Sequence, residues 1–280
     1  MIYLLLAMIS SMLVSVLMRL SEKHCRGGMG MLAANYVMCC SLSLAFAGSI
    51  QLFPAADGLP AALGFGVVNG VLYLAGFVLL QWNIQRNGVV LPATFQKLGV
   101  LVPTLAAITV FGETPRVTQL LGIAVAVFAI IFMQPGAGEG KSSGKALPGL
   151  LCLLLCGGMS DVMSKVFQTW GNPDHANYFL VLTFAVALVL CLGLCAVKKQ
   201  SVTLPDILCG LCLGIPNYMS ARFLLWSLTD VPAVIVYPTF SVGTIIAVTV
   251  VGMLAFHEKV GKRKLLAIGL ILGALVLLNV

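Results

Sequence analysis

The sequence predicts an all-α integral membrane protein with ten transmembrane helices, arranged as two inverted five-helix repeats. Three observations lead to this fold class: the composition, the recurrence of apolar segments long enough to cross a bilayer, and an internal repeat at half the length of the chain. Of 280 residues, 60% are hydrophobic and only 9% are charged, whereas a soluble domain carries about 25% charged residues. The mean hydropathy is +1.06.

Ten apolar segments approach or exceed the roughly 20 residues that cross about 30 Å of hydrocarbon. They are 2–19, 29–53, 60–83, 89–111, 116–134, 147–168, 176–197, 204–228, 232–256 and 264–280. The short loops between them leave no room for a soluble domain or a nucleic-acid-binding module. The first segment is expected to be a retained helix and not a signal peptide, because its basic residues follow the apolar run.

The two halves of the chain resemble one another. Three short matches recur in the same order: ANY at 34–36 and 176–178, GFGVVNG at 64–70 and CLGIPNY at 212–218, and FGE at 111–113 and FHE at 256–258. We therefore predict a first repeat at 1–134, a linker rich in Gly, Ser and Lys at 135–146, and a second repeat at 147–280. Five spans per repeat force the halves to insert in opposite orientations, an arrangement typical of transporters.

These features resemble the EamA-like branch of the drug/metabolite transporter superfamily. The resemblance covers the whole chain and rests on two five-span halves, with Glu113 and Glu258 closing the fourth span of each half and a span rich in Gly and Leu after it. It implies a helical bundle with a central cavity and the movement of small metabolites. Family members are commonly drawn with cytoplasmic termini, whereas the positive-inside rule applied to the loop Lys and Arg residues places both termini outside.

Lys97 is the most unusual residue of the fourth span. A charged side chain at the centre of a bilayer costs about 2.5 to 3.5 kcal/mol on insertion scales, so it needs a partner, a wet cavity or access to the interface. We expect Lys97, with its neighbour Gln96, to face a central cavity and bind an anionic or electron-rich group of a substrate. The alternative is a snorkelling lysine.

The sixth span carries Asp161 and Lys165 in the favourable i, i+4 order, with Ser164 and Gln168 on the same face. The matching positions of the first span are Met12 and Val16, so the scaffold does not require this pair. A neutralised ion pair and a role in substrate binding or proton coupling both remain open.

Spans three and eight carry Gly and Pro at corresponding places, which predicts broken helices at a binding site. Close packing of Gly66 with Gly70 and of Gly210 with Gly214 is the competing explanation. The polar residues near these positions are predicted to bind substrate. They are Asn69, Tyr73, Asn217 and Arg222. For Arg222, which lies near the outer end of its span, contact with the lipid headgroups is the alternative.

Tyr237 and Ser241, in the ninth span, are further candidates for substrate contact, whereas Tyr36 and Tyr178 are expected to anchor at the membrane interface. As the family resemblance implies, Glu113 and Glu258 are expected to cap helices or hold loops. Eight of the nine cysteines lie inside predicted spans, where they fit packing better than metal or redox chemistry. We expect no cofactor and no metal.

The sequence thus predicts a secondary transporter of the cytoplasmic membrane and not an enzyme. Its expected substrate is a small amino-acid-like, zwitterionic or anionic metabolite, moved by alternating access. The alternatives are a flippase for a lipid-linked metabolite and an intramembrane enzyme, although the motifs of intramembrane proteases are missing from the sequence. Partners are expected to be the substrate, membrane lipid and a second copy that docks through the fifth and tenth spans, but no nucleic acid.

Overall fold

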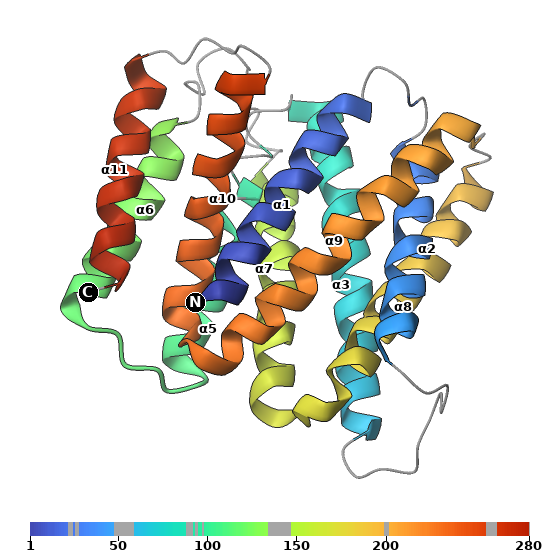
Figure 1. Cartoon of the computed structure of the whole chain (residues 1–280), viewed down its shortest axis with the longest axis horizontal. Helices are drawn as coiled ribbons and strands as arrows, with labels where there is room; N and C mark the ends of the chain where they lie inside the picture. The colour runs from blue at the N-terminus through green and yellow to red at the C-terminus, as the bar shows by residue number, and fades with distance from the viewer. Residues whose placement is uncertain are drawn as a thin grey trace. The chain divides into compact units, whose positions relative to one another are not determined.

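All regular secondary structure among the described residues is helical (Figure 1). The computed structural model describes residues 1–21, 25, 28–47, 59–87, 92, 95, 96, 98–133, 147–198, 202–255 and 262–279. The α-helices of these residues are α1 (Ile2–Ser21), α2 (Gly28–Phe46), α3 (Leu59–Asn87), α5 (Leu101–Thr109), α6 (Val117–Met133), α7 (Leu147–Trp170), α8 (Ala176–Val197), α9 (Leu204–Asp230), α10 (Ala233–Ala255) and α11 (Lys262–Asn279). A short 3₁₀ turn, η2 (Pro173–His175), precedes α8.

Six of the described helices are long and apolar enough to cross a membrane. They comprise α2, α7, α8 and α9 with the segments Leu59–Leu80 of α3 and Ala233–Leu254 of α10. Shorter apolar helices occur at Ile2–Met18 and Val117–Phe132. The predicted all-α membrane fold is therefore confirmed, and one of the described helices overlaps each of the ten predicted spans.

Hydropathy places the helix ends less well than the helix centres. Helix α3 continues to Asn87, four residues past the predicted end of the span, because a helix can extend beyond the apolar layer into polar sequence. Helix α2 ends at Phe46 although the predicted span runs to 53, and residues 48–53 lie outside the described residues.

The chain forms two compact units. Unit 1 comprises Met1, Ala75–Val162 and Asp230–Val280, and unit 2 comprises Ile2–Leu74 and Met163–Thr229. Helices α3 and α7 contribute one part to each unit. Each unit thus combines segments of both predicted repeats. The division of the chain into repeats at 1–134 and 147–280 stays a prediction.

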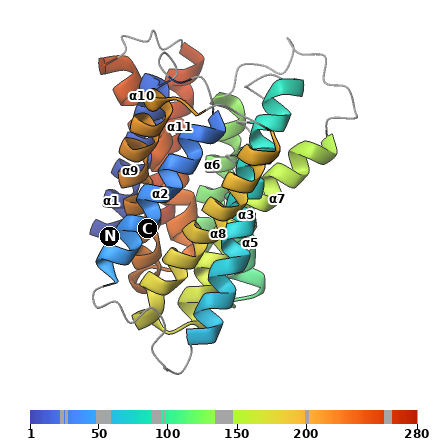
Figure 2. The same ribbon diagram turned by 90° about the vertical axis from the view of Figure 1, so that its right-hand side faces the viewer.

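In unit 2, α3 packs closely on α8 through two glycines (Figure 2). A Cβ atom at Gly66 would lie 2.8 Å from the Phe179 carbonyl oxygen, and one at Gly70 would lie 2.5 Å from the Thr183 carbonyl oxygen. Both pairs advance by one helical turn in the same direction, so α3 and α8 run parallel. The small residues allow the two backbones to approach, as in the small-xxx-small motif of membrane helices.

Close contacts at two glycines also join α9 to α2 in unit 2. A Cβ atom at Gly210 would collide with the Met31 carbonyl oxygen, and one at Gly214 would lie 2.7 Å from the Asn35 carbonyl oxygen. Close packing is therefore the role of both glycine pairs. The predicted break in these helices is wrong, because α3 is continuous and α9 continues through Pro216.

Helices α2 and α8 also pack against one another within unit 2, and they run antiparallel. Cys191, late in α8, donates from its Sγ to the Met29 carbonyl oxygen near the start of α2, at 3.7 Å. Asn177, at the start of α8, donates from Nδ2 to the carbonyl oxygen of Phe46, the last residue of α2, at 3.0 Å.

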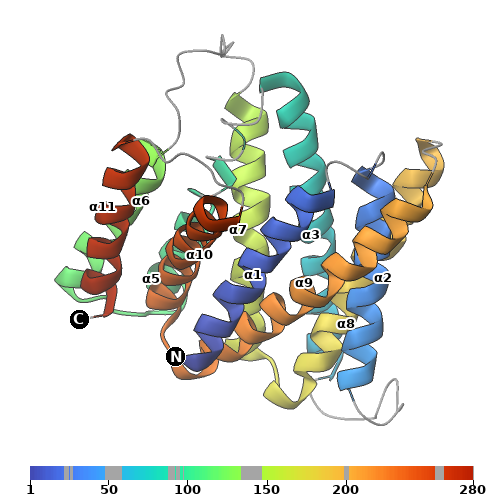
Figure 3. The ribbon, with the colours of Figure 1, turned by 45° about the horizontal axis from the view of Figure 1, so that its top comes forward.

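In unit 1, α6 and α11 form a second antiparallel pair (Figure 3). A Cβ atom at Gly122, early in α6, would lie 3.1 Å from the Ala274 carbonyl oxygen, late in α11. Ala126, Ala129 and Ile130 of α6 form a buried core with Ala274 and with Val242 of α10. The small side chains let the helices meet at short range.

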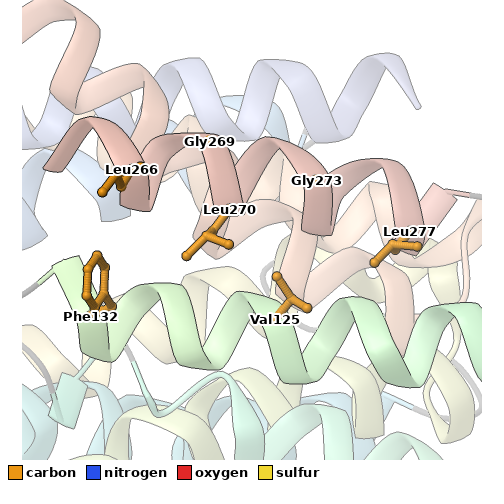
Figure 4. Close-up of a pocket in the computed structure, with 7 residues that line it drawn as sticks. All are labelled: Val125, Phe132, Leu266, Gly269, Leu270, Gly273 and Leu277. Atoms are coloured by element: carbon orange, nitrogen blue, oxygen red, sulfur yellow. The ribbon is translucent and has the colours of Figure 1, made fainter. Parts of the chain in front are cut away.

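An apolar groove of about 530 Å³ runs along α6 and α11. Figure 4 shows the side chains of Val125 and Phe132 on α6 directed toward α11. The groove is lined by Val125, Phe132, Leu266, Gly269, Leu270, Gly273 and Leu277. A Cβ atom at Gly269 or Gly273 would meet no heavy atom within 4 Å, so the space beside these two glycines of α11 is open.

Glu113 joins the end of α5 to the start of α10 in unit 1. Its carboxylate accepts hydrogen bonds from the backbone N–H groups of Ala233, at 3.0 Å, and Val234, at 2.8 Å. Ile235 and Val236 donate to the Pro232 carbonyl oxygen, and Pro232 has no N–H to satisfy. The first turn of α10 is therefore fully satisfied, and the predicted capping role of Glu113 is confirmed; Glu258 lies outside the described residues.

Replacing Gly214 by alanine should destabilise the protein by about 1 to 3 kcal/mol, the usual cost of overpacking, because the new methyl group would meet the Asn35 carbonyl oxygen. The measurement is the unfolding midpoint of the purified protein in detergent. Gly193→Ala in α8 is the matched control, since a Cβ there meets nothing within 4 Å. Equal midpoints for the two variants would contradict the packing role of Gly214.

Replacing Glu113 by alanine should free the first turn of α10 and cost about 1 to 2 kcal/mol, as for loss of an N-cap. Glu113→Gln, which keeps one acceptor oxygen, should fall between wild type and alanine. Hydrogen exchange measured on a peptide spanning 231–236 reports the effect, and exchange as slow in Glu113→Ala as in wild type would show that the carboxylate does not hold this turn.

Candidate functional site

The residues predicted to contact substrate fall into two groups. Asn69, Tyr73, Lys165, Asn217 and Arg222 belong to unit 2. The members in unit 1 are Gln96, Asp161, Tyr237 and Ser241. Lys97 lies outside the described residues, so its surroundings stay a prediction.

Asn217 of α9 is the centre of a polar network in unit 2. Its Nδ2 donates to Asn35 Oδ1 of α2 at 3.1 Å, and its Oδ1 accepts a hydrogen bond from Tyr73 Oη of α3 at 3.0 Å. Cys39 Sγ lies 3.7 Å from the same Nδ2 and donates to the Gly214 carbonyl oxygen at 3.4 Å. The network ties three helices together at the depth of the glycine contacts.

Asn69 makes the corresponding contact between α3 and α8. Its Nδ2 donates to Thr183 Oγ1 at 3.3 Å, and Thr183 in turn donates to the Phe179 carbonyl oxygen at 2.8 Å. Asn69 is only 4% exposed. A buried amide in apolar surroundings must be paired, and here its partner comes from the neighbouring helix.

A cluster of aromatic rings continues from Tyr73 across unit 2. Tyr73 contacts Tyr36 and Phe184 at centroid distances of 6.2 and 5.8 Å, Phe184 contacts Tyr218 at 6.2 Å, and Tyr218 stacks on Phe46 at 5.9 Å. These separations are typical of favourable ring pairs. Tyr36 is 1% exposed, so the expectation that it anchors at the membrane interface is wrong.

Arg222 of α9 lies at the end of this cluster. Its guanidinium carbon is 4.4 Å from the Phe46 ring centroid, 4.5 Å from that of Trp226 and 5.9 Å from that of Tyr218. Its Nη1 donates to Tyr218 Oη at 2.6 Å. Aromatic faces attract cations, so the rings hold the charge in a half-buried position within the protein.

Helix α1 supports the far side of this arrangement. Tyr3 contacts Trp226 at 5.2 Å and Phe223 at 6.5 Å. Ser220 donates from Oγ to the Ala7 carbonyl oxygen at 3.3 Å. The ring of Trp226 is thereby braced by residues of α1 and α9.

Residues of the predicted polar face of α7 take part in hydrogen bonds. Lys165 is buried, and its Nζ donates to Gln168 Oε1 at 3.1 Å. In unit 1, the carbonyl oxygen of Asp161 accepts a hydrogen bond from Tyr237 Oη at 2.6 Å. Tyr237 is 1% exposed, so in this conformation it presents almost no ring surface to a solute.

Helix α10 carries further buried hydroxyl groups in unit 1. Thr239 and Thr244 flank Ser241, and the Oγ1 atoms of these two threonines have no hydrogen-bond partner among the described residues. Pro238 lies inside the helix and cannot donate to the carbonyl of Val234. This stretch is thus the most polar part of α10. Gln96, in contrast, is exposed.

Among the residues that the structure describes, no group of His, Cys, Asp and Glu is arranged to hold a metal ion. Cys25 lies between α1 and α2, and its Sγ donates to the Pro205 carbonyl oxygen at 3.7 Å. Burial, followed by the neighbouring thiol of Cys209, raises the pKa of Cys25 to about 11. This thiol is therefore protonated and weakly nucleophilic near neutral pH.

The sequence reasoning missed most of the aromatic residues around Arg222. Phe46, Phe184, Trp226 and Tyr3 come from four helices and share no local motif. Asn35 did have a signal, because it belongs to the repeated ANY motif, but its pairing with Asn217 required knowing that α2 packs on α9.

Comparison with known proteins supports the assignment made from sequence. The sequence model of the EamA-like transporter family, part of the drug/metabolite transporter superfamily, matches residues 145–280. The predicted resemblance is therefore confirmed over these residues, and the family suggests a multi-pass membrane transporter.

The chain is also similar to an uncharacterized protein of Haemophilus influenzae (strain ATCC 51907 / DSM 11121 / KW20 / Rd), with 24% identity over 211 residues, covering 74% of this chain and 72% of that one. A solved crystal structure of a protein matches with a TM-score of 0.78 at 13% identity, over 99% of this chain and 94% of that chain. At this identity the likeness shows the fold alone.

Replacing Asn217 by leucine should destabilise the protein more than replacing Tyr73 by phenylalanine. The first change leaves both Asn35 and Tyr73 without their shared partner, whereas the second removes one hydrogen bond, worth about 1 kcal/mol. Unfolding midpoints in detergent measure both. A double variant with additive losses would show that the two side chains do not interact.

Proposed function

We propose that the protein is a secondary transporter that moves a small polar metabolite across the cytoplasmic membrane by alternating access. In this proposal ten spans form two inverted five-helix repeats around a central cavity. The EamA-like sequence of residues 145–280 supports transport as the activity. The observation that carries the architecture is the direction in which corresponding helices of the two halves run.

An in-plane twofold axis requires that corresponding helices of two repeats run in opposite directions. The second spans of the halves are α2 and α8, and the fifth spans are α6 and α11; both pairs are antiparallel within their units. The fourth spans, α5 and α10, meet end to start through Glu113. All three pairs have the relation that inverted repeats demand.

The glycine contacts support the same symmetry. Helix α3 packs parallel to α8, and its proposed counterpart α9 packs parallel to α2. Exchanging the two halves turns the first of these pairs into the second. Two similar halves related in this way can exchange conformations, so that a site between them opens to one side and then to the other.

The rare charges suggest the kind of solute. We infer that Lys97 and Arg222 favour an anionic group and that Asp161 favours a cationic one, while Gln96, Asn69, Tyr73, Asn217, Lys165, Tyr237 and Ser241 supply polar contacts in states of the transport cycle. An amino acid or a derivative satisfies both charges, and sugar-like or nucleotide-like solutes come next.

A flippase for a lipid-linked metabolite is the second candidate. The apolar groove along α6 and α11 favours it, because its lining is entirely apolar and suits an acyl chain. We also propose that a homodimer, if it forms, uses the fifth and tenth spans. Their facing surfaces are occupied by one another around Gly122, so a second copy would dock on the side of Gly269 and Gly273.

Reconstituted vesicles test the transport proposal with a panel of labelled amino acids and organic acids. Wild-type vesicles should accumulate or release at least one solute faster than protein-free vesicles. Lys97→Ala should reduce the rate about 10- to 100-fold, the equivalent of one charge-assisted hydrogen bond, and Lys97→Arg should retain more. Lys198→Ala, which removes an exposed lysine at the end of α8, is the control.

Failure of every solute to move would contradict transport of small metabolites, and movement of a fluorescent lipid instead would favour the flippase. Wild-type rates in both Lys97 variants would make Lys97 structural.

A further inference from the structure

We propose that Arg222, with the rings of Phe46 and Trp226, forms a receptor for the carboxylate of an organic acid or amino acid. The inference rests on the proposed transport function and names the chemical group by which the substrate is held. It is carried by the position of the rings, by the donors that Arg222 has left, and by the charges around it.

Two aromatic rings lie close to the guanidinium of Arg222. A guanidinium is planar, and its N–H donors all lie in that plane. Phe46 and Trp226 lie at nearly equal short distances from the guanidinium carbon, 4.4 and 4.5 Å. Aromatic rings attract the cation through its charge, and the N–H donors at the guanidinium edge can give a planar carboxylate two parallel hydrogen bonds.

Most of the donors of Arg222 are available. Within the part of the chain that the structure describes, its one hydrogen bond is from Nη1 to Tyr218 Oη. That bond restrains the guanidinium without neutralising its charge. The remaining N–H groups form a fork of the kind that recognises carboxylates.

The acidic side chains described in unit 2 lie away from Arg222. Asp206 accepts hydrogen bonds from Thr203, at 2.9 Å from the backbone N–H and 2.6 Å from the hydroxyl, at the opposite end of α9. Asp174 lies in η2 and is exposed. No described carboxylate pairs with Arg222. A cation in a membrane protein needs a counter-charge, and an anionic solute supplies it.

The receptor is built in advance of the ligand. Phe46 stacks on Tyr218 with an interplanar angle of 16°, and Asn177 holds the Phe46 carbonyl. Tyr3 and Phe223 contact the ring of Trp226. A group held by packed neighbours loses little conformational entropy on binding. A residue that serves only to fasten α2 to α9 would make the same ring contacts but would not discriminate between ligands, and this difference can be measured.

The experiment uses labelled benzoate as the probe and benzamide as its neutral isostere. The full-length protein is purified in dodecyl maltoside, which contains no phosphate, and saturable benzoate binding is measured with benzamide as competitor. We expect benzoate to bind and benzamide not to displace it. Arg222→Gln should lose about 10- to 100-fold in affinity, and Arg222→Lys, which keeps the charge but not the fork, should lose less. Lys198→Gln, which removes a cation elsewhere, should bind like wild type.

Phe46→Leu keeps the apolar volume but removes one ring, and it should weaken benzoate binding severalfold while the unfolding midpoint stays close to that of wild type. The midpoint is recorded for each variant, so that loss of binding is separated from loss of fold. Equal benzoate affinity in wild type and Arg222→Gln, or displacement by benzamide, would overturn the proposal.

A lipid phosphate is the other source of an oxyanion. Adding anionic phospholipid to the detergent-purified protein separates the two sources. Stabilisation of wild type but not of Arg222→Gln by the lipid, with no benzoate binding, would assign the site to headgroups and overturn the carboxylate receptor. The binding assay and the vesicle assay test different proposals. Transport of solutes that lack a carboxylate would contradict the carboxylate receptor but not the transport function. Benzoate binding without transport of any solute would contradict the transport function but not the receptor.

Discussion

The close approach of helix backbones at glycine governs the rest of unit 2. At Gly66 and Gly70 the backbone of α3 reaches the carbonyls of α8, and at Gly210 and Gly214 the backbone of α9 reaches those of α2. Lipid offers no hydrophobic force between helices, so association depends on such packing and on hydrogen bonds. The polar contacts between α3 and α8 and between α9 and α2 depend on the separation that the glycines allow.

The polar network follows from that separation. Asn217 is three residues after Gly214, and Asn69 lies between Gly66 and Gly70, so each amide is held where a short side chain reaches the neighbouring helix. Arg222 is two turns beyond Gly214 on α9, about 12 Å along the axis. There Arg222 of α9 contacts the ring of Phe46 at the end of α2. At this level the contact between α2 and α9 is aromatic, whereas near Gly214 it is made by amide hydrogen bonds.

The features that could be predicted from sequence are those that depend on local pattern. Hydropathy locates the helices, because bilayer thickness sets their length, and Glu113 could be named as a cap from its place at a span end. The choice between a broken and a closely packed helix at Gly66 or Gly214 could not, because it depends on which helix lies opposite. The setting of Arg222 depends on Phe46 and Trp226, and only the fold brings Phe46 to α9.

The polar residues of unit 2 differ in how many of their hydrogen bonds are already made within the protein. The amide of Asn217 donates to Asn35 and accepts from Tyr73, and Asn69 donates to Thr183, so a solute that bound these groups would have to replace bonds that hold helices together. A paired neutral network costs little in an apolar interior, whereas a charge without a counter-ion costs much more. Among the described residues of unit 2, no carboxylate pairs with Arg222, and the aromatic rings beside it reduce the cost of its charge. In this conformation the amides therefore hold helices together, so solute contact with them requires another state of the transport cycle, whereas Arg222 has donors left for a ligand.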